Sequence, residues 1–335
     1  MIKILCLHSS TSLASYRYRV EQFMPFWKEY GIQVDLVSLS GKGYPDKLKL
    51  ALSAARYDYV WLQKKVLSPI FINIIASRSR LIYDFDDAIY STGSHTSGYV
   101  NPSHAGSRQT VSRLHHVLKK SFLVFAGSPE LVAYSRQFNA SDVQLVPTAL
   151  EMPVWNPYLR NPVDPVTVGW IGITSNMPYL ELVDEAVKQV QVRHPDVVFS
   201  LMSGEPEAGL KARWEFVPWS RETEQTWLQS IDIGIMPLTD EEWSRGKCAF
   251  KLLQYMSYAK PVIASPVGAN IDAVIQAKSG YLAATSAEWY EAIESLITKP
   301  ELRQRMGEEG LKLFQEQYER SIVQSKIARI LHDRF

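Results

Sequence analysis

Residues 231–270 contain the side chains best suited to bind a phosphorylated ligand. Their sequence is IDIGIMPLTDEEWSRGKCAFKLLQYMSYAKPVIASPVGAN, which predicts a buried strand, a polar loop and an apolar helix. Lys247 lies just before the predicted helix and Lys251 one turn inside it, where N–H groups and the helix dipole favour anions. Two such ammonium groups can flank a diphosphate, and Gln254 on nearly the same face can bind a ribose diol.

The alternative for this helix is a solvated surface element whose two lysines bind nothing. Its apolar residues argue against that alternative, because they predict a helix that is mostly buried. A lysine in the first turn of a buried helix needs a partner. These apolar residues are Leu252, Leu253, Tyr255 and Met256.

Three carboxylates lie at the end of the predicted strand Leu81–Phe85: Asp84, Asp86 and Asp87, in the run LIYDFDDAIY. Strand alternation places Asp84 and Asp86 on one face and Asp87 at the start of a turn. Crowded carboxylates shift one another's pKa and are costly unless they are used, which favours a catalytic role. Capping of a turn or helix is the alternative, and a divalent metal is a further use for such a cluster.

Two loops that follow predicted strands add donors for phosphate. Arg17 and Arg19, in SSTSLASYRYR, begin a helix and are expected to face a ligand phosphate, with ordinary surface arginines as the alternative. Gly172, Thr174 and Ser175, in VGWIGITSNMPYL, can donate from backbone N–H groups and hydroxyls, with a tight turn as the alternative. The sequence has no G-x-G-x-x-G motif, which counts against a dinucleotide-dependent dehydrogenase.

Short β-branched runs alternate with segments of helical length along all 335 residues, which predicts an α/β fold with parallel sheets. The proline-rich stretch 147–165 interrupts the alternation and is interpreted as a linker between two doubly wound, Rossmann-like domains. The expected domains are 1–160 and 161–318, and a last helix over 319–335 is predicted to cross back onto the first domain. Ligands of such sheets bind at the carboxyl ends of the strands, so both domains should contribute to a cleft. The predicted strands are Ile2–Leu7, Gln33–Ser38, Tyr59–Leu62, Leu81–Phe85, Phe122–Ala126, Val143–Val146, Val166–Ile171, Val197–Met202, Trp214–Val217, Ile231–Met236, Pro261–Ala264 and Gly280–Ala283.

Composition narrows the class of protein further. Residues 1–160 hold 18 Lys and Arg against 11 Asp and Glu, whereas residues 161–335 hold 18 against 24, so the halves carry +7 and −6. The basic half suits phosphates or the anionic face of a membrane, and no basic run indicates nucleic acid. No apolar run reaches the roughly 18–20 residues of a membrane span, and the two separate cysteines predict a cytoplasmic protein.

Residues 237–268 resemble the nucleotide-sugar site of the family 4 glycosyltransferases, which have the two-domain GT-B fold. Many bacterial members carry P-L-x-D-x-x-W-x-x-G-K-x-x-F-K-L-L-[EQ]-Y-M-A-x-G-x-P-V-[IV]-A-S-x-V-G. The family's acidic pair is replaced here by Gly246 and Gln254. The resemblance implies that the donor nucleotide is bound by Lys247, Lys251, Leu253 and Gln254, by Gly172, Thr174 and Ser175, and at the nucleobase by Val217 and Trp219.

The same resemblance extends to the first half of the chain. Asp86 and Asp87 occupy the place of the family's His-Asp pair near the reacting sugar, and Arg17 and Arg19 match an S-x-R-Y-R segment. Asp84, Asp86 and Asp87 are therefore the predicted catalytic residues, while Arg17 and Arg19 are expected to bind donor or acceptor phosphate.

The activity implied is that of a hexosyltransferase acting in polysaccharide biosynthesis. It would move a sugar, with retention, from a UDP- or GDP-sugar to a glycan or lipid-linked acceptor, with no cofactor and no metal. Peripheral contact with the inner membrane face is a further expectation. The alternatives are a nucleotide-sugar epimerase of the same fold and a non-enzymatic, two-lobed sugar-binding protein.

Overall fold

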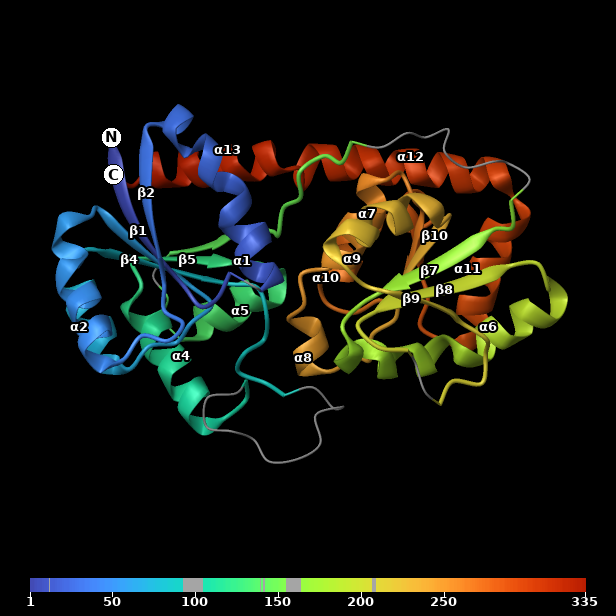
Figure 1. Ribbon diagram of the computed structural model, residues 1–335, viewed down its shortest axis with the longest axis horizontal. Coiled ribbons are helices and arrows are strands. Elements are labelled where there is room, and N and C mark those ends of the chain that lie inside the picture. The colour runs from blue at the N-terminus through green and yellow to red at the C-terminus, as the bar shows by residue number, and fades with distance from the viewer. Residues whose placement is uncertain (12, 93–104, 139, 141, 155–163, 207–208) are drawn as a thin grey trace. The chain divides into compact units, whose positions relative to one another are not determined.

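The computed structural model describes residues 1–11, 13–92, 105–138, 140, 142–154, 164–206 and 209–335. The chain forms two compact units (Figure 1). Unit 1 comprises Met1–Glu151, Glu241–Cys248 and Arg320–Phe335, and unit 2 comprises Met152–Asp240 and Ala249–Glu319. The predicted boundary after residue 160 lies outside the described residues. The sequence-based prediction put residues 241–248 in the second domain, whereas the structure groups them with unit 1.

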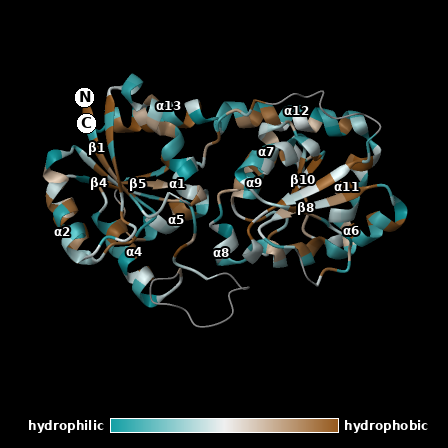
Figure 2. Cartoon of the chain, in the orientation of Figure 1, coloured by the Kyte–Doolittle hydropathy of each residue, from teal (hydrophilic) through white to brown (hydrophobic). Residues whose placement is uncertain are grey.

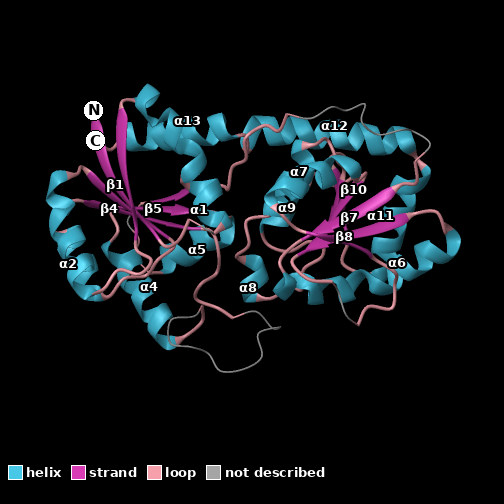
Figure 3. Cartoon of the chain, in the orientation of Figure 1, coloured by secondary structure: helices cyan, strands magenta, loops and turns pink. Residues whose placement is uncertain are grey.

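Each unit contains one parallel sheet of six strands with helices on its faces, which confirms the predicted α/β class (Figure 3). All twelve predicted strands are present, with ends that differ by at most two residues. Unit 1 has β1 (Ile2–His8), β2 (Ile32–Ser38), β3 (Tyr59–Gln63), β4 (Arg80–Phe85), β5 (Leu123–Ala126) and β6 (Val143–Leu145). Unit 2 has β7 (Thr167–Ile171), β8 (Val198–Ser203), β9 (Glu215–Pro218), β10 (Ile233–Met236), β11 (Val262–Ala264) and β12 (Gly280–Leu282).

The sheet of unit 1 has the order β2-β1-β3-β4-β5-β6. Alternate residues of its strands face two separate apolar cores, as expected for strands buried on both sides. One face packs against α1, η1 and α13, and the opposite face against α2, α3, α4 and α5. The bounds are α1 (Ala14–Arg19), η1 (Glu21–Tyr30), α2 (Tyr44–Ser53), η2 (Ala54–Arg56), α3 (Pro69–Ala76), α4 (Arg108–Lys120), α5 (Pro129–Gln137), α8 (Glu242–Arg245) and α13 (Arg320–His332).

The sheet of unit 2 has the order β12-β11-β10-β7-β8-β9. Gly169 of β7 pairs with Gly234 of β10, and a Cβ on either would meet the rings of Trp227 or Tyr255 at under 3 Å. The two glycines therefore let α7 and α9 approach the sheet closely. The bounds are η3 (Thr174–Leu180), α6 (Glu181–Arg193), α7 (Arg221–Ser230), α9 (Phe250–Ser257), α10 (Ala269–Ala273), α11 (Ser286–Thr298) and α12 (Pro300–Gln317).

Hydropathy follows these layers. In Figure 2 the strands are mostly apolar, while the helices alternate between apolar and hydrophilic surfaces, as amphipathic covering helices do. In the described part of the chain, no helix combines the length and the apolar character needed to cross a bilayer.

Several helix ends differ from the sequence-based prediction, and two of these differences bear on the candidate site. The helix that Arg17 and Arg19 were expected to begin divides into α1 and the tighter η1, where Pro25 removes an N–H donor and its ring opposes a regular α-helix. The helix predicted from Cys248 begins instead at Phe250, preceded by Ala249 in the left-handed conformation with φ of 53°. Lys247 therefore lies outside this helix.

The last helix, α13, belongs to unit 1 (Figure 1). Its residues Val323, Ile327 and Leu331 join the same apolar core as Phe23 and Trp27 of η1. Polar contacts accompany this packing. They are Gln324 Nε2 to Phe23 O (3.0 Å), Tyr59 Oη to Leu331 O (3.1 Å) and His332 Nε2 with Tyr30 O (2.8 Å).

Replacement of Ile327 by Ala tests how much this packing contributes to stability. Ile327 is 1% exposed, so Ile327→Ala is expected to lower the free energy of unfolding by about 2–5 kcal/mol. The matched control is Ile322→Ala on the same helix, where the side chain is 45% exposed and the loss should stay within about 0.5 kcal/mol. Urea denaturation of both variants gives the comparison, and equal small losses would mean that α13 contributes little to unit 1.

Candidate functional site

The strand order of unit 2 reverses between β10 and β7. In doubly wound sheets, ligands bind outside the carboxyl ends of the strands at such a point. Two of the predicted site residues meet there: Gly172 follows β7 directly, and Lys251 lies in the first turn of α9, which follows β10 along the chain. The Lys251 Nζ atom is 5.0 Å from the centroid of the Trp170 ring.

The contact at Gly172 is close. A Cβ on Gly172 would lie 2.5 Å from the Trp170 ring and 3.1 Å from Lys251 Cε, so any larger residue would displace both side chains. The Gly172 N–H donates to Met202 O at 3.0 Å, which continues the ladder between β7 and β8. Thr174 and Ser175 follow as exposed residues of the same loop. The backbone that follows β7, two hydroxyls and the Lys251 ammonium group thus lie together at this edge.

The predicted nucleoside residues lie further along the carboxyl edge of the same sheet. Val217 is part of β9, and Trp219 follows it with a ring that is 40% exposed. Gln254 is buried on α9, one turn beyond Lys251. Glu224 of α7, which the sequence analysis missed, accepts hydrogen bonds from Trp219 Nε1 (2.5 Å) and Gln254 Nε2 (3.1 Å). Leu253 has no exposed surface, so its side chain contributes to packing alone.

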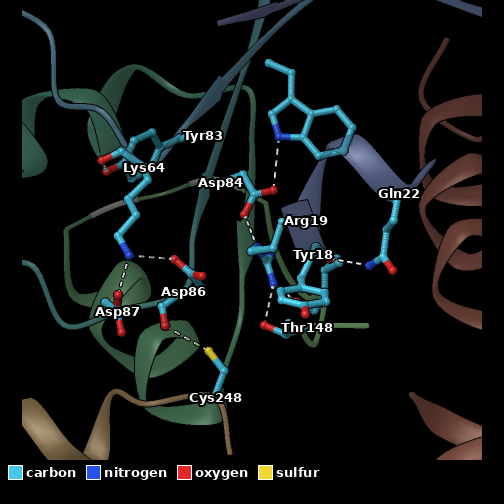
Figure 4. Close-up of polar contacts among 12 residues, drawn as sticks. Tyr18, Arg19, Gln22, Lys64, Tyr83, Asp84, Asp86, Asp87, Thr148 and Cys248 are labelled. Atoms are coloured by element: carbon cyan, nitrogen blue, oxygen red, sulfur yellow. Dashed lines mark hydrogen bonds and ion pairs between the residues drawn. The ribbon is translucent and has the colours of Figure 1, made fainter. Parts of the chain in front are cut away.

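In unit 1, Arg19 and Asp84 form a buried ion pair (Figure 4). Arg19 Nε donates to Asp84 Oδ1 at 2.7 Å, and Trp61 Nε1 donates to the other oxygen at 3.1 Å. Arg19 Nη1 also donates to Val146 O at 3.0 Å. Arg19 is 2% exposed and Asp84 is 1% exposed, and the two side chains bind each other. The sequence analysis had instead predicted that Arg19 binds a phosphate and that Asp84 lies at the reacting centre.

The charges of this pair are strongly perturbed. Burial raises the pKa of Asp84 to about 6, against the opposing effect of the Arg19 charge. Burial also opposes the charge of Arg19, but the carboxylates of Asp84 and Asp86 outweigh it and raise the Arg19 pKa. Arg17 lies apart from this pair, with its guanidinium 5.1 Å from the centroid of the Tyr18 ring.

Asp86 and Asp87 have a different cation as partner (Figure 4). Lys64, directly after β3, places its Nζ 3.2 Å from Asp86 Oδ1 and also contacts Asp87. Burial opposes the Lys64 charge, but the two carboxylates outweigh burial and raise the pKa of Lys64, so this lysine stays protonated at neutral pH. Its backbone has a positive φ of 59°, which turns the chain at the strand end. The sequence carries a signal for Lys64, since Lys64 and Lys65 follow the apolar run YVWL after a single residue, Gln63.

Residues Glu241–Cys248 lie against the Asp86 turn within unit 1. The Cys248 thiol, whose pKa burial raises, donates to Asp86 O at 3.0 Å. Lys247 Nζ lies 5.3 Å from the centroid of the Trp243 ring, and burial lowers its pKa while the Asp87 charge opposes that shift. The predicted phosphate residue Lys247 is therefore placed near the carboxylates of unit 1, and Lys251 is placed in unit 2.

A row of polar residues crosses the carboxyl end of the same sheet. In the strand register Leu7 pairs with Leu62, and Gln63 pairs with Asp84. His8, Gln63 and Asp84 therefore lie side by side on the face that α1 covers. His8 is 3% exposed and Gln63 has no exposed surface, yet neither His8 Nδ1 nor the Gln63 amide has a hydrogen-bond partner within the described residues. Buried polar groups without partners are rare, which sets this row apart from the other strand ends of unit 1.

The sequence analysis missed both His8 and Gln63, although each is the polar residue that ends an apolar strand. Among the residues that the structure describes, no group of three or more His, Cys, Asp or Glu side chains is arranged to hold a metal ion.

Comparison with solved structures defines the class of fold. HepE from Anabaena, in a complex with UDP and glucose, aligns with a TM-score of 0.72 at 14% identity, covering 99% of this chain and 100% of that chain. Sucrose-phosphate synthase from Thermosynechococcus elongatus aligns with a TM-score of 0.71 at 14% identity, covering 99% of each chain. The lipopolysaccharide outer core galactosyltransferase WaaB aligns with a TM-score of 0.69 at 10% identity over the full length of both. The chain has the GT-B fold, as the sequence predicts.

The amino-acid sequence adds information on the family. Residues 165–299 match the family model of the glycosyl transferases group 1, and this range contains all six strands of unit 2. The family match and the fold together indicate a glycosyltransferase enzyme. No curated protein matches the chain at a significant level.

The ion pair of unit 1 makes a prediction about stability. Asp84→Asn leaves the Arg19 charge buried without its counter-charge and is expected to lower the free energy of unfolding by about 3–5 kcal/mol. Asp87→Asn is the matched control, because the Asp87 side chain is 32% exposed and its loss should cost at most about 1 kcal/mol. Chemical denaturation measures both, and an Asp84→Asn variant as stable as the wild type would show that the pair is dispensable.

Proposed function

We propose that the protein is a hexosyltransferase that moves a sugar from a nucleoside diphosphate sugar to a glycan or lipid-linked acceptor. The observation that carries the proposal is the meeting of Gly172 and Lys251 at the point where the strand order of unit 2 reverses. This point lies in the segment that matches the group 1 glycosyl transferases.

The donor diphosphate is assigned to unit 2. Gly172 allows a phosphate to approach the backbone after β7, and Thr174 and Ser175 add hydroxyl donors. Lys251 carries a positive charge in the first turn of α9, where the helix dipole adds to it. A fixed positive charge at this position stabilises the negative charge that develops on the diphosphate as it leaves. The Lys251 ammonium group, the loop N–H groups and the two hydroxyls then stabilise the diphosphate, so the proposal requires no metal and no further cofactor.

UDP is the first choice of nucleotide, and GDP the second. HepE, which shares the fold, binds UDP and UDP-glucose in its crystals. Gln254 and Trp219 supply an amide for a ribose and a flat ring for a base. Trp219 has no feature that selects one base over another, so both nucleotides belong in the test.

The acceptor is assigned to unit 1. Asp86 is held in place by Lys64, and its backbone oxygen by Cys248, so the carboxylate can orient the attacking hydroxyl of the acceptor. The excess of Lys and Arg in residues 1–160 suits an acceptor carried on a lipid diphosphate at the inner face of a membrane.

Retention of the anomeric configuration and a place in polysaccharide biosynthesis rest on the resemblance of residues 237–268 to the family 4 enzymes. Proton NMR of the first product would decide the configuration, because the two anomers differ in the coupling of the anomeric proton.

Thermal unfolding with a panel of UDP, GDP, ADP and dTDP sugars tests the function. A ligand at about 100 times its dissociation constant stabilises the folded protein by about 2.7 kcal/mol, so one nucleotide should raise the melting temperature clearly above the others. A panel in which no nucleotide sugar raises it would contradict the proposal.

Lys251→Met tests the diphosphate site. The variant is expected to bind UDP roughly ten- to hundredfold more weakly and uridine nearly as well as the wild type, because a charge-assisted contact to phosphate is lost. Lys188→Met, at an exposed position of α6, is the control. Calorimetric titration measures all four affinities, and equal losses for UDP and uridine would give Lys251 a structural role.

Asp86→Asn tests the acceptor side. The variant is expected to keep its affinity for donor and to lose little stability, because Asp87 still pairs with Lys64, while kcat falls roughly a hundredfold or more because the acceptor hydroxyl loses its orienting carboxylate. Asp46→Asn, at an exposed position in the first turn of α2, is the control. Steady-state rates with varied acceptor distinguish the two, and unchanged turnover combined with a lower melting temperature would make the carboxylate structural.

A further inference from the structure

One carboxylate of unit 2 holds two side chains that the sequence places 35 residues apart. Glu224 accepts from Trp219 Nε1 through Oε2 (2.5 Å) and from Gln254 Nε2 through Oε1 (3.1 Å). Both oxygens of the carboxylate are therefore used, one for a loop residue after β9 and the other for α9. Figure 1 shows α7, which carries Glu224, beside α9.

Trp219 is an unusual tryptophan in this protein. It is 40% exposed and is the most exposed tryptophan among the described residues. Its position is nevertheless fixed at two points, because its backbone N–H donates to Ser203 O at 2.8 Å and its ring N–H donates to Glu224. A flat apolar ring that is both exposed and fixed in orientation can stack on a nucleobase at a small entropic cost.

Gln254 connects this ring to the diphosphate end of the site. It is 5% exposed, and it lies three residues after Lys251, which contacts Gly172 at the end of β7. The path from Gly172 to Trp219 crosses from β7 to β9, which are separated by one strand, a distance of about 10 Å. Phosphate, ribose and base groups arranged in that order would follow this path.

We propose that Glu224 is the positioning residue for the nucleoside of the donor. It holds Trp219 as the surface on which the base stacks, and it holds the amide of Gln254 so that the amide oxygen accepts from a ribose hydroxyl. The inference rests on the proposed function, since it assumes a nucleoside diphosphate donor. Glu224 lies outside the 237–268 motif, and it places a carboxylate beside Gln254, the residue at the second acidic position of that motif.

Stacking on an aromatic ring depends little on the identity of the base. Glu224 therefore acts on nucleosides as a class, and its loss should weaken UDP and GDP by similar factors. The loss of Glu224 should not change the affinity for inorganic pyrophosphate, because pyrophosphate reaches only Gly172 and Lys251.

Calorimetric titration of Glu224→Gln with UDP, UMP and pyrophosphate tests the inference. The expected result is a loss of roughly ten- to hundredfold in affinity for UDP and for UMP, and no change for pyrophosphate. Glu222→Gln is the matched control, because Glu222 is exposed two residues earlier on the same helix. Glu222→Gln should keep the melting temperature of the wild type, while Glu224→Gln should lower it only slightly, because Gln254, which is 5% exposed, loses a charged partner.

A second variant keeps the test independent of any local loss of structure. Trp219→Ala should weaken UDP by a similar factor, and the double variant should lose less than the product of the two single losses, because Glu224 acts through Trp219. Quenching of tryptophan fluorescence by UDP should disappear in Trp219→Ala and weaken in Glu224→Gln.

The outcomes separate this inference from the proposed function. Glu224→Gln with unchanged affinity for UDP, or with equal losses for UDP and pyrophosphate, overturns the role of Glu224 and leaves the donor assignment intact. Independent, multiplicative losses in the double variant overturn the coupling to Trp219. A wild-type protein that binds none of the nucleotides removes the proposed function itself.

Discussion

The ion pair between Arg19 and Asp84 is the contact on which unit 1 depends. Its two charges are almost completely removed from water, so each requires the other. Through this pair α1 is joined to β4, and through Arg19 Nη1 it is joined to the stretch that follows β6. Asp86, two residues beyond Asp84, owes its position to this anchored strand end, and so does the polar row that begins at His8. If Asp84 lost its partner Arg19, the buried and uncompensated carboxylate would disturb the groups at this edge of the sheet, from His8 to Asp86.

Parallel sheets explain how much of the site the sequence could predict. The carboxyl ends of all strands gather at one edge, so residues at strand ends converge without any long-range information. The alternation of β-branched runs and helical segments was sufficient for all twelve strands, and it brought Gly172 and Lys251 to the same edge. The alternation could not predict which side chains would contact one another, because Arg19 and Asp84 are 65 residues apart in the sequence, and Cys248 and Asp86 are 162 apart. Periodicity sets the face on which a side chain lies but does not say which charge it meets there.

Residues 237–268 resemble the family 4 motif but differ from it at two acidic positions, and both differences have a physical explanation in the structure. At the first acidic position, Gly246 lies against Ala88, and a Cβ there would be 2.5 Å from the Ala88 side chain and 3.1 Å from its backbone. A glutamate has no room at that place. At the second position, the amide of Gln254 donates a hydrogen bond to the carboxylate of Glu224 on a neighbouring helix. The motif alone therefore shows only that two glutamates are missing. In the fold, Gly246 has no room for a side chain, and the carboxylate beside Gln254 comes from Glu224.

The grouping of α13 with unit 1 has a consequence for synthesis on the ribosome. A domain at the N-terminus ordinarily folds while the rest of the chain is being made. Here the apolar face formed by Phe23, Trp27 and Tyr59 is covered by α13, which is synthesised after unit 2. Residues 152–319 lie between the first segment of unit 1 and α13, and their synthesis at about 5–20 residues per second takes roughly 8–34 s. During that interval the face is open to chaperones and to other nascent chains, so unit 1 completes its core only after unit 2 has been synthesised.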